Sequence, residues 1–125
     1  MDPEQLPLFV ETPPFTRRWA QLGLTDKNLS VLQSAIMDNP QQGNVISGTG
    51  GFRKMRFVPE NSGRGKSGAF RVIYLPIPRL RSIVLGVVFA KSEAANIDSA
   101  DKRDLIRLAG VYESLLDDFF SGGRS

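Results

Sequence analysis

The apolar positions at the start of the chain recur with helical spacing. After a short apolar run over 8–10, which predicts a first strand, Phe15, Trp19 and Leu22 repeat at i, i+4 and i+7. This spacing predicts a helix over 13–22 that buries one face.

A second apolar stripe is formed by Leu29, Leu32 and Ile36. It predicts a helix that ends before Pro40, because the residue preceding a proline avoids the helical region. We expect the two helices to form an N-terminal helical hairpin. Their aromatic side chains belong to the core rather than to a base-stacking surface.

Beyond Gly43 the apolar positions alternate, as they do in strands. The first such segment, 51–58, predicts a strand. The basic side chains Lys54 and Arg56 leave this strand on the same side, so both charges should share one face of a sheet.

A further strand is predicted over 69–75, with Arg71 near its start, and the prolines Pro76 and Pro78 interrupt it at a turn. The run over 82–90 is the most apolar of these segments, which is typical of an inner strand. The connections between these strands are too short for parallel crossovers. We therefore expect a mostly antiparallel sheet.

A last helix is predicted from a cap at Asp98 or Ser99 up to Gly122. Its apolar stripe comprises Leu105, Leu108, Ala109, Tyr112, Leu115, Leu116 and Phe119. The predicted fold is α+β, with the helical hairpin, a twisted, mostly antiparallel sheet of three to five strands, and a C-terminal helix. We expect one domain over 1–120 and a flexible tail over 121–125.

The residue types that are missing narrow the chemistry. The chain has no cysteine and no histidine, which excludes disulfides, thiol nucleophiles and the commonest zinc ligand and general base. We expect neither a metal nor a cofactor. The longest apolar run, 83–90, is far shorter than the roughly 20 residues that span a bilayer. The sequence therefore predicts a soluble, cytoplasmic protein with no membrane partner.

Charge is sorted along the chain. Between 44 and 91 there are nine basic side chains and one acidic one, Glu60, whereas the segments on either side are net acidic. Such sorting predicts a field of one sign over one face of the domain. The natural ligand of a basic face is a polyanion, above all the phosphate backbone of a nucleic acid.

A glycine-rich segment, 63–68, matches the pattern G-x-G-x-x-G of dinucleotide-binding loops. Its context argues against that role, because the glycines lead into a strand rather than a helix, and Glu60 stands where a P-loop needs glycine. We interpret Arg64 and Lys66 in this segment, together with Arg53, as contacts to RNA or the ribosome.

Four further cations come from strands that should be neighbours: Lys54, Arg56, Arg71 and Lys91. As a purely structural feature they would form the solvated polar face of a sheet. However, no carboxylate lies among them, and gathering like charges costs Coulomb energy that a structural role does not return. The electrostatics favour a phosphate site.

The residues around these cations also resemble a known family. The matching segments are Gly48-Thr49-Gly50-Gly51-Phe52-Arg53-Lys54-Met55-Arg56-Phe57, then Gly65-Lys66-Ser67-Gly68 with Arg71-Val72-Ile73-Tyr74, and Phe89-Ala90-Lys91-Ser92-Glu93. Together with Pro40-x-x-Gly43 they closely resemble the HigB branch of the RelE-like toxins. The resemblance implies a RelE-like fold and a toxin of a type II toxin–antitoxin system. Such a toxin is a ribosome-dependent endoribonuclease, or mRNA interferase, which cleaves mRNA in the ribosomal A site and inhibits translation. Its partners would be the ribosome, mRNA and a cognate antitoxin of the helix-turn-helix type.

The chemistry that the resemblance implies is attack of a ribose 2′-hydroxyl on the adjacent phosphate. This reaction needs proton removal, charge neutralisation and protonation of the leaving oxygen. Matched by motif position, Arg56 and Arg71 would act on the phosphate. Lys54 or Lys91 would transfer protons or support charge.

Two departures from the family pattern leave the general base open. The chain has Ser92 and Asp98 where the family has an arginine and a tyrosine. Three hypotheses from different classes therefore remain: a toxin nuclease, a non-catalytic RNA- or ribosome-binding module, and a protein-interaction domain whose basic face docks an acidic partner.

Overall fold

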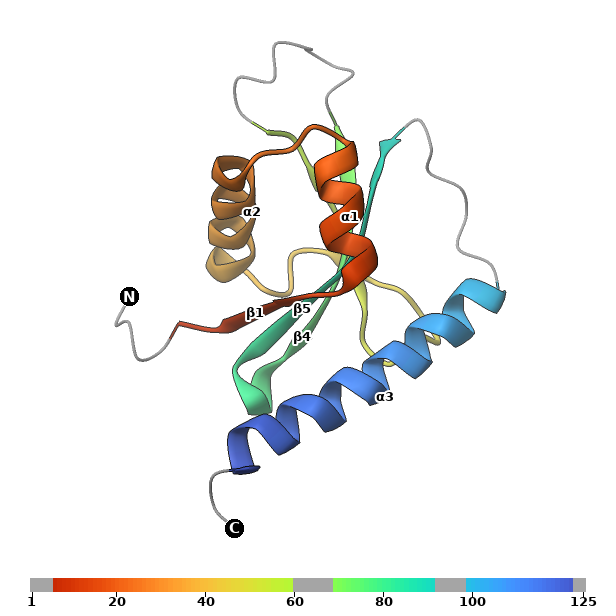
Figure 1. The fold of residues 1–125 in the computed structure, drawn as a ribbon. Coiled ribbons are helices and arrows are strands. Elements are labelled where there is room, and N and C mark those ends of the chain that lie inside the picture. The colour runs from red at the N-terminus through yellow and green to blue at the C-terminus, as the bar shows by residue number, and fades with distance from the viewer. Residues whose placement is uncertain (1–5, 60–68, 92–98, 123–125) are drawn as a thin grey trace.

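A computed structural model of the chain describes residues 6–59, 69–91 and 99–122 (Figure 1). The elements are β1 (Leu8–Glu11), α1 (Pro13–Gln21), α2 (Asp26–Asp38), β2 (Asn44–Val45), β3 (Arg53–Phe57), β4 (Phe70–Ile77), the 3₁₀ helix η3 (Pro78–Leu80), β5 (Ser82–Ala90) and α3 (Ser99–Ser121). The predicted class, α+β with a C-terminal helix, is confirmed.

The five strands form one mixed sheet in the order β1-β5-β4-β3-β2. β1 pairs with β5 in parallel, and the other three pairs are antiparallel. The prediction of a mostly antiparallel sheet of up to five strands is therefore confirmed. β5 is an inner strand, as its continuous apolar run predicts.

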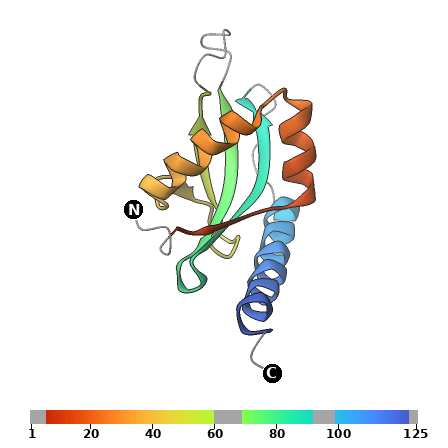
Figure 2. The same cartoon turned by 60° about the vertical axis from the view of Figure 1, so that its left-hand side comes forward.

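α1 and α2 cover one face of this sheet (Figures 1 and 2). α1 begins after Thr12, whose hydroxyl accepts a hydrogen bond from the Phe15 amide at 3.2 Å, as a helix N-cap does. The Trp19 ring stacks on Phe15 at a centroid distance of 5.4 Å and on Phe57 of β3 at 6.0 Å. These aromatic side chains belong to the core, as predicted.

α2 packs on the same face through Leu32 and Ile36, both fully buried. Its N-terminus is held by reciprocal hydrogen bonds between Thr25 and Asn28, which satisfy backbone donors that the helix itself leaves free. Both predicted N-terminal helices are thus present. Their packing against each other as a helical hairpin stays a prediction.

α3 covers the opposite face with a narrower stripe than the sequence predicts. Leu105, Ala109 and Leu116 are buried against the sheet. Leu115 and Phe119, which were expected on the same stripe, are 55% and 69% exposed. The prediction was wrong for these two, because the buried residues of α3 follow one line along the helix and both side chains lie off it.

The predicted end of the strand over 69–75 is also corrected. β4 continues through Pro76 to Ile77, and the turn begins at Pro78. Proline is tolerated there because β3 pairs with β4 up to Tyr74, so one edge of β4 lacks a strand neighbour at Pro76. The turn closes with Arg81 in the left-handed conformation, at φ 49°.

The end of α3 shortens the predicted tail, because the helix includes Ser121. The rest of the tail, 123–125, lies outside the described residues. So does the whole glycine-rich segment, 63–68.

Candidate nucleic-acid interface

The strand register brings two of the predicted site residues together. Arg56 of β3 is the direct cross-strand partner of Arg71 of β4. On its other side, Arg71 pairs with Phe89 of β5. A row of two guanidinium groups and one aromatic ring therefore crosses three neighbouring strands. Lys54 stands one row further along β3, opposite Ile73.

Alternation places these cations on the face that α3 covers in part. Met55 and Phe57 of β3 point into the core under α1 and α2, so Lys54 and Arg56 point to the other side. The prediction that both share one face is confirmed. We call Lys54, Arg56 and Arg71 the basic face. The end of the sheet at which β5 ends and β4 begins lies away from the C-terminal half of α3 in Figure 1.

Arg71 is the least solvated cation of the basic face. It is half-buried, whereas Lys54 and Arg56 are exposed. Its Nη1 atom is buried and has no hydrogen-bond partner in the described parts of the chain. A buried donor without a partner costs about 1–3 kcal/mol, and more when it is charged. An anion at this position would remove that cost.

Compensating charge is also missing from the basic face in the part of the chain that the structure describes. Within residues 6–59, 69–91 and 99–122, neither Lys54, Arg56 nor Arg71 makes an ion pair. Like charges directly opposite each other on two strands are destabilising. The planar fork of an arginine matches two oxygens of a phosphate, so the pair of arginines is suited to bind one.

Lys91 and Arg53 lie in different positions. Lys91 follows β5 and its amide donates to the Ala69 carbonyl at 3.1 Å, so its exposed side chain belongs to the same end of the sheet as Arg71. Arg53 is on the opposite face. Its Nη1 donates to the carbonyls of Gln41 (3.0 Å) and Gly43 (2.7 Å), which fixes the segment after α2.

The remaining predicted contacts cannot be placed against this face. Arg64 and Lys66 lie outside the described residues, as do Ser92 and Asp98. Their assignments stay predictions from the sequence.

A contrasting cation lies at the other end of the sheet. Arg79, in the turn between β4 and β5, donates to both carboxylate oxygens of Asp117 at 2.8 and 2.9 Å and to Glu113 at 2.7 Å. These hydrogen bonds raise the pKa of Arg79 and lower that of Asp117. Arg79 joins the turn to α3, so it takes no part in the basic face.

Phe89 is the residue of this region that sequence reasoning did not assign to the site. Its side chain is half-buried and next to Arg71 in the row. The alternation of the strand over 82–90 places Phe89 on one face, but its pairing with Arg71 depends on a register shift between Ile73 and Tyr74. Such an irregularity is not visible in the sequence.

Other kinds of site have little support in the part of the chain that the structure describes. No three Asp or Glu side chains gather there as a group that could hold a metal ion. Among the described helices, none combines the length and the apolar character needed to cross a membrane. No protein-family model matches the chain. The geometry of the basic face is therefore the main guide to function.

Proposed function

We propose that this protein is the toxin of a type II toxin–antitoxin pair with a RelE-like fold, and that it cleaves mRNA on the ribosome. The single observation that carries the proposal is the Arg56–Arg71 pair. The two arginines are direct cross-strand partners, and Nη1 of Arg71 is buried without a partner in the described residues. Such a pair is suited to hold one phosphate group in a fixed orientation.

In this proposal the phosphate next to the scissile bond lies on Arg71 and Arg56. A base removes the proton of the ribose 2′-hydroxyl, the hydroxyl oxygen bonds to phosphorus, and the bond to the 5′ oxygen breaks. The arginines stabilise the extra negative charge on the phosphoryl oxygens. Lys54 or Lys91 supports this charge or transfers the protons.

Phe89 fits the same proposal. Its ring lies next to Arg71 across the β4–β5 pair, so a nucleotide whose phosphate contacts Arg71 would have its base or ribose near the ring. Aromatic rings stack on bases without regard to sequence. The partners in this proposal are the ribosome, mRNA and a cognate antitoxin in the cytoplasm, with Arg64 and Lys66 as additional contacts.

A non-catalytic RNA- or ribosome-binding module is the second candidate. One observation favours it: the chain contains no histidine to act as a base near neutral pH. A phosphate site of this kind can bind RNA without cleaving it.

The proposal is tested with purified protein, translating ribosomes and a labelled mRNA. We expect cleavage of the ribosome-bound mRNA and little cleavage of the same RNA free in solution, because a site without a complete set of acid–base groups needs the ribosome to align the substrate. Binding to ribosomes with intact mRNA would favour the second candidate. Equal cleavage of free RNA would indicate a self-sufficient ribonuclease.

A further inference from the structure

Exposed apolar residues gather on α3. Of the nine exposed large hydrophobic side chains in the described parts of the chain, five belong to this helix: Ile106, Val111, Leu115, Phe119 and Phe120. Val111, Leu115 and Phe119 follow one another at intervals of four residues, so they form one row along the helix. We call these three residues the outer row. Single exposed apolar residues are normal on a surface, whereas a contiguous row indicates an interaction site.

The fold leaves the outer row open to approach. The buried line of α3, which includes Leu105 and Leu116, faces the sheet. α3 lies at the outside of the domain, and no described element covers its outer side (Figures 1 and 2). Burial of exposed apolar surface is the main driving force of protein association, so the row provides such a force for a partner that can cover it.

One charge of each sign borders the outer row. Asp118 is exposed and makes no ion pair among the described residues, whereas the two other carboxylates of this half of the helix are bonded to Arg79. Before the row stands the exposed Arg107. Its contact with Asp104, at 3.3 Å, joins side chains that are 74% and 67% exposed, and such a pair contributes little. The row therefore has a cation at its start and an anion near its end.

The spacing of these charges matches a second copy of the same helix. Eleven residues separate Arg107 from Asp118, about three turns at 3.6 residues per turn, so both lie on the same side of the row. In an antiparallel pair with Val111 against Leu115 of the second copy, Arg107 comes level with Phe119 of that copy, directly after Asp118. One register thus brings together apolar residues and opposite charges. A parallel pair would set Arg107 against Arg107.

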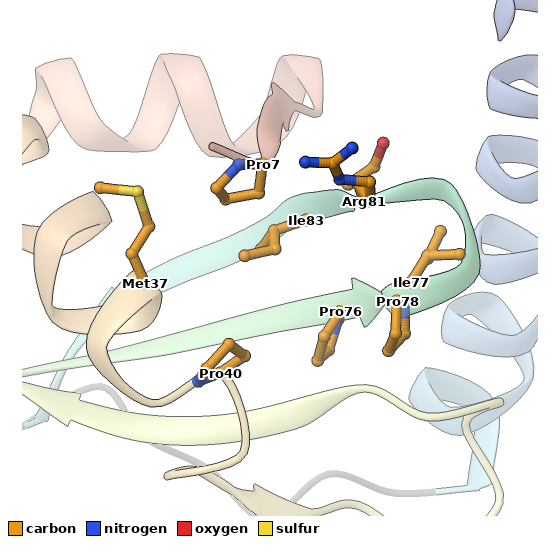
Figure 3. A pocket seen from close by; sticks show the side chains of 9 residues that line it. Pro7, Met37, Pro40, Pro76, Ile77, Pro78, Arg81 and Ile83 are labelled. Carbon is orange, nitrogen blue, oxygen red and sulfur yellow. The ribbon is translucent and has the colours of Figure 1, made fainter. Parts of the chain in front are cut away.

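A second apolar surface lacks this property. A pocket of about 230 Å³ lies between the C-terminal end of α2 and the turn that joins β4 to β5 (Figure 3). Its wall is mainly apolar, and none of its lining residues belongs to α3. The one charged residue of the lining, Arg81, already has an interaction of its own. The pocket therefore offers no charge that would specify an occupant, whereas the outer row carries both signs.

We propose that the outer row binds a second copy of this chain, in an antiparallel α3–α3 pair with twofold symmetry. In such an interface the same patch is used on both copies, and antiparallel helices oppose their dipoles favourably. Three apolar residues per copy bury less than the roughly 1,200 Å² of the smallest stable interfaces, so the pair is weak and reversible. It uses no residue of the basic face and is independent of the proposed nuclease activity.

The first test is sedimentation equilibrium of the native protein in low salt. Concentrations from about 1 μM to about 1 mM cover the affinities of small interfaces, and we expect a monomer–dimer equilibrium in this range. Leu115→Glu should raise the dissociation constant at least about tenfold, because it places a charge at the centre of the apolar contact. Ile106→Glu is the matched control. Ile106 is 49% exposed on the same helix but about two and a half turns from Leu115, so it lies on the other side and should leave the constant unchanged.

The second test exchanges the charges. Arg107→Glu and Asp118→Arg each set like charges against each other across the pair, so each variant alone should associate at least about threefold more weakly. An equimolar mixture of the two variants should regain the native affinity, because one copy then supplies both anions and the other both cations. Within one helix the two positions are roughly 16 Å apart, so this recovery can only arise between copies.

Three results would overturn the proposal. They are a monomer at every concentration, an unchanged dissociation constant in Leu115→Glu, and a mixture of the charge variants that associates no better than either variant alone. The mixing experiment leaves the outer row intact, so it decides the matter even if Leu115→Glu does not fold.

Discussion

The two ends of β4 carry arginines in opposite circumstances. At the turn, Arg79 forms short hydrogen bonds with Asp117 and Glu113 of α3. At the start of the strand, Arg71 faces another arginine, Arg56, and its Nη1 atom is buried without a partner in the described residues. Among the described residues, the same side chain type thus joins two elements at one end of β4 and has no compensating partner at the other.

This difference separates structural charge from charge that is available to a ligand. A structural arginine has its carboxylates supplied by the fold, which is the case at the turn. An arginine with a buried Nη1 atom that finds no partner in the described residues is retained at a cost. We therefore propose that an anion binds at the start of β4, and the following predictions test that separation.

The largest effect on stability is expected where α3 packs on the sheet. Leu116→Ala should lower the free energy of unfolding by roughly 2–5 kcal/mol, because this side chain is buried among apolar neighbours. Leu115→Ala is the matched control. This neighbour on the same helix is 55% exposed, and its truncation should change stability by less than about 0.5 kcal/mol. Urea denaturation measures both, and equal losses would contradict the observed packing of α3.

A smaller effect of opposite sign is expected at the start of β4. Arg56→Gln removes the like charge opposite Arg71 and should raise the free energy of unfolding by about 0.2–1 kcal/mol. The gain should shrink in 1 M salt, because the repulsion is screened. The same variant should bind RNA more weakly. A loss of stability at low salt would show that Arg56 has a structural partner.

The smallest effect concerns the pH dependence of the Arg79 contact. Arg79 holds the pKa of Asp117 below its usual value, so the contact stabilises the fold above the pKa of a free Asp, roughly 3.9. This contribution is lost as the pH falls through the lower pKa of the folded state. The melting temperatures of the native protein and Arg79→Ala should therefore differ at pH 5–7 and converge below pH 4. A difference that persists at pH 2–3 would assign the effect to packing of the arginine.

Much of the fold can be predicted from the sequence, because local patterns determine it. The spacing of Phe15 and Trp19 gives α1 and its buried face, and the alternation around Met55 gives β3 and the shared side of Lys54 and Arg56. Such periodicities depend on burial of one face, which the sequence records directly.

Features that depend on distant partners could not be predicted. The exposure of Leu115 follows from the line along which α3 meets the sheet. The ion pairs of Arg79 join residues far apart in the chain. Counting the charges between 44 and 91 therefore does not reveal them. The alignment of Phe89 with Arg71 depends on a register shift between two strands. None of these leaves a local pattern in the residues concerned.

The most direct test of the central claim is single-turnover cleavage of ribosome-bound mRNA by Arg71→Ala at saturating protein. We expect a loss on the order of 100-fold or more in rate, the scale for removing one group that stabilises the transition state, without a fall in the melting temperature. Arg79→Ala is the control, and it should cleave at the rate of the native protein. Cleavage by Arg71→Ala at nearly the native rate, or an equal loss in both variants, would contradict the assignment of the uncompensated arginine pair as the phosphate site.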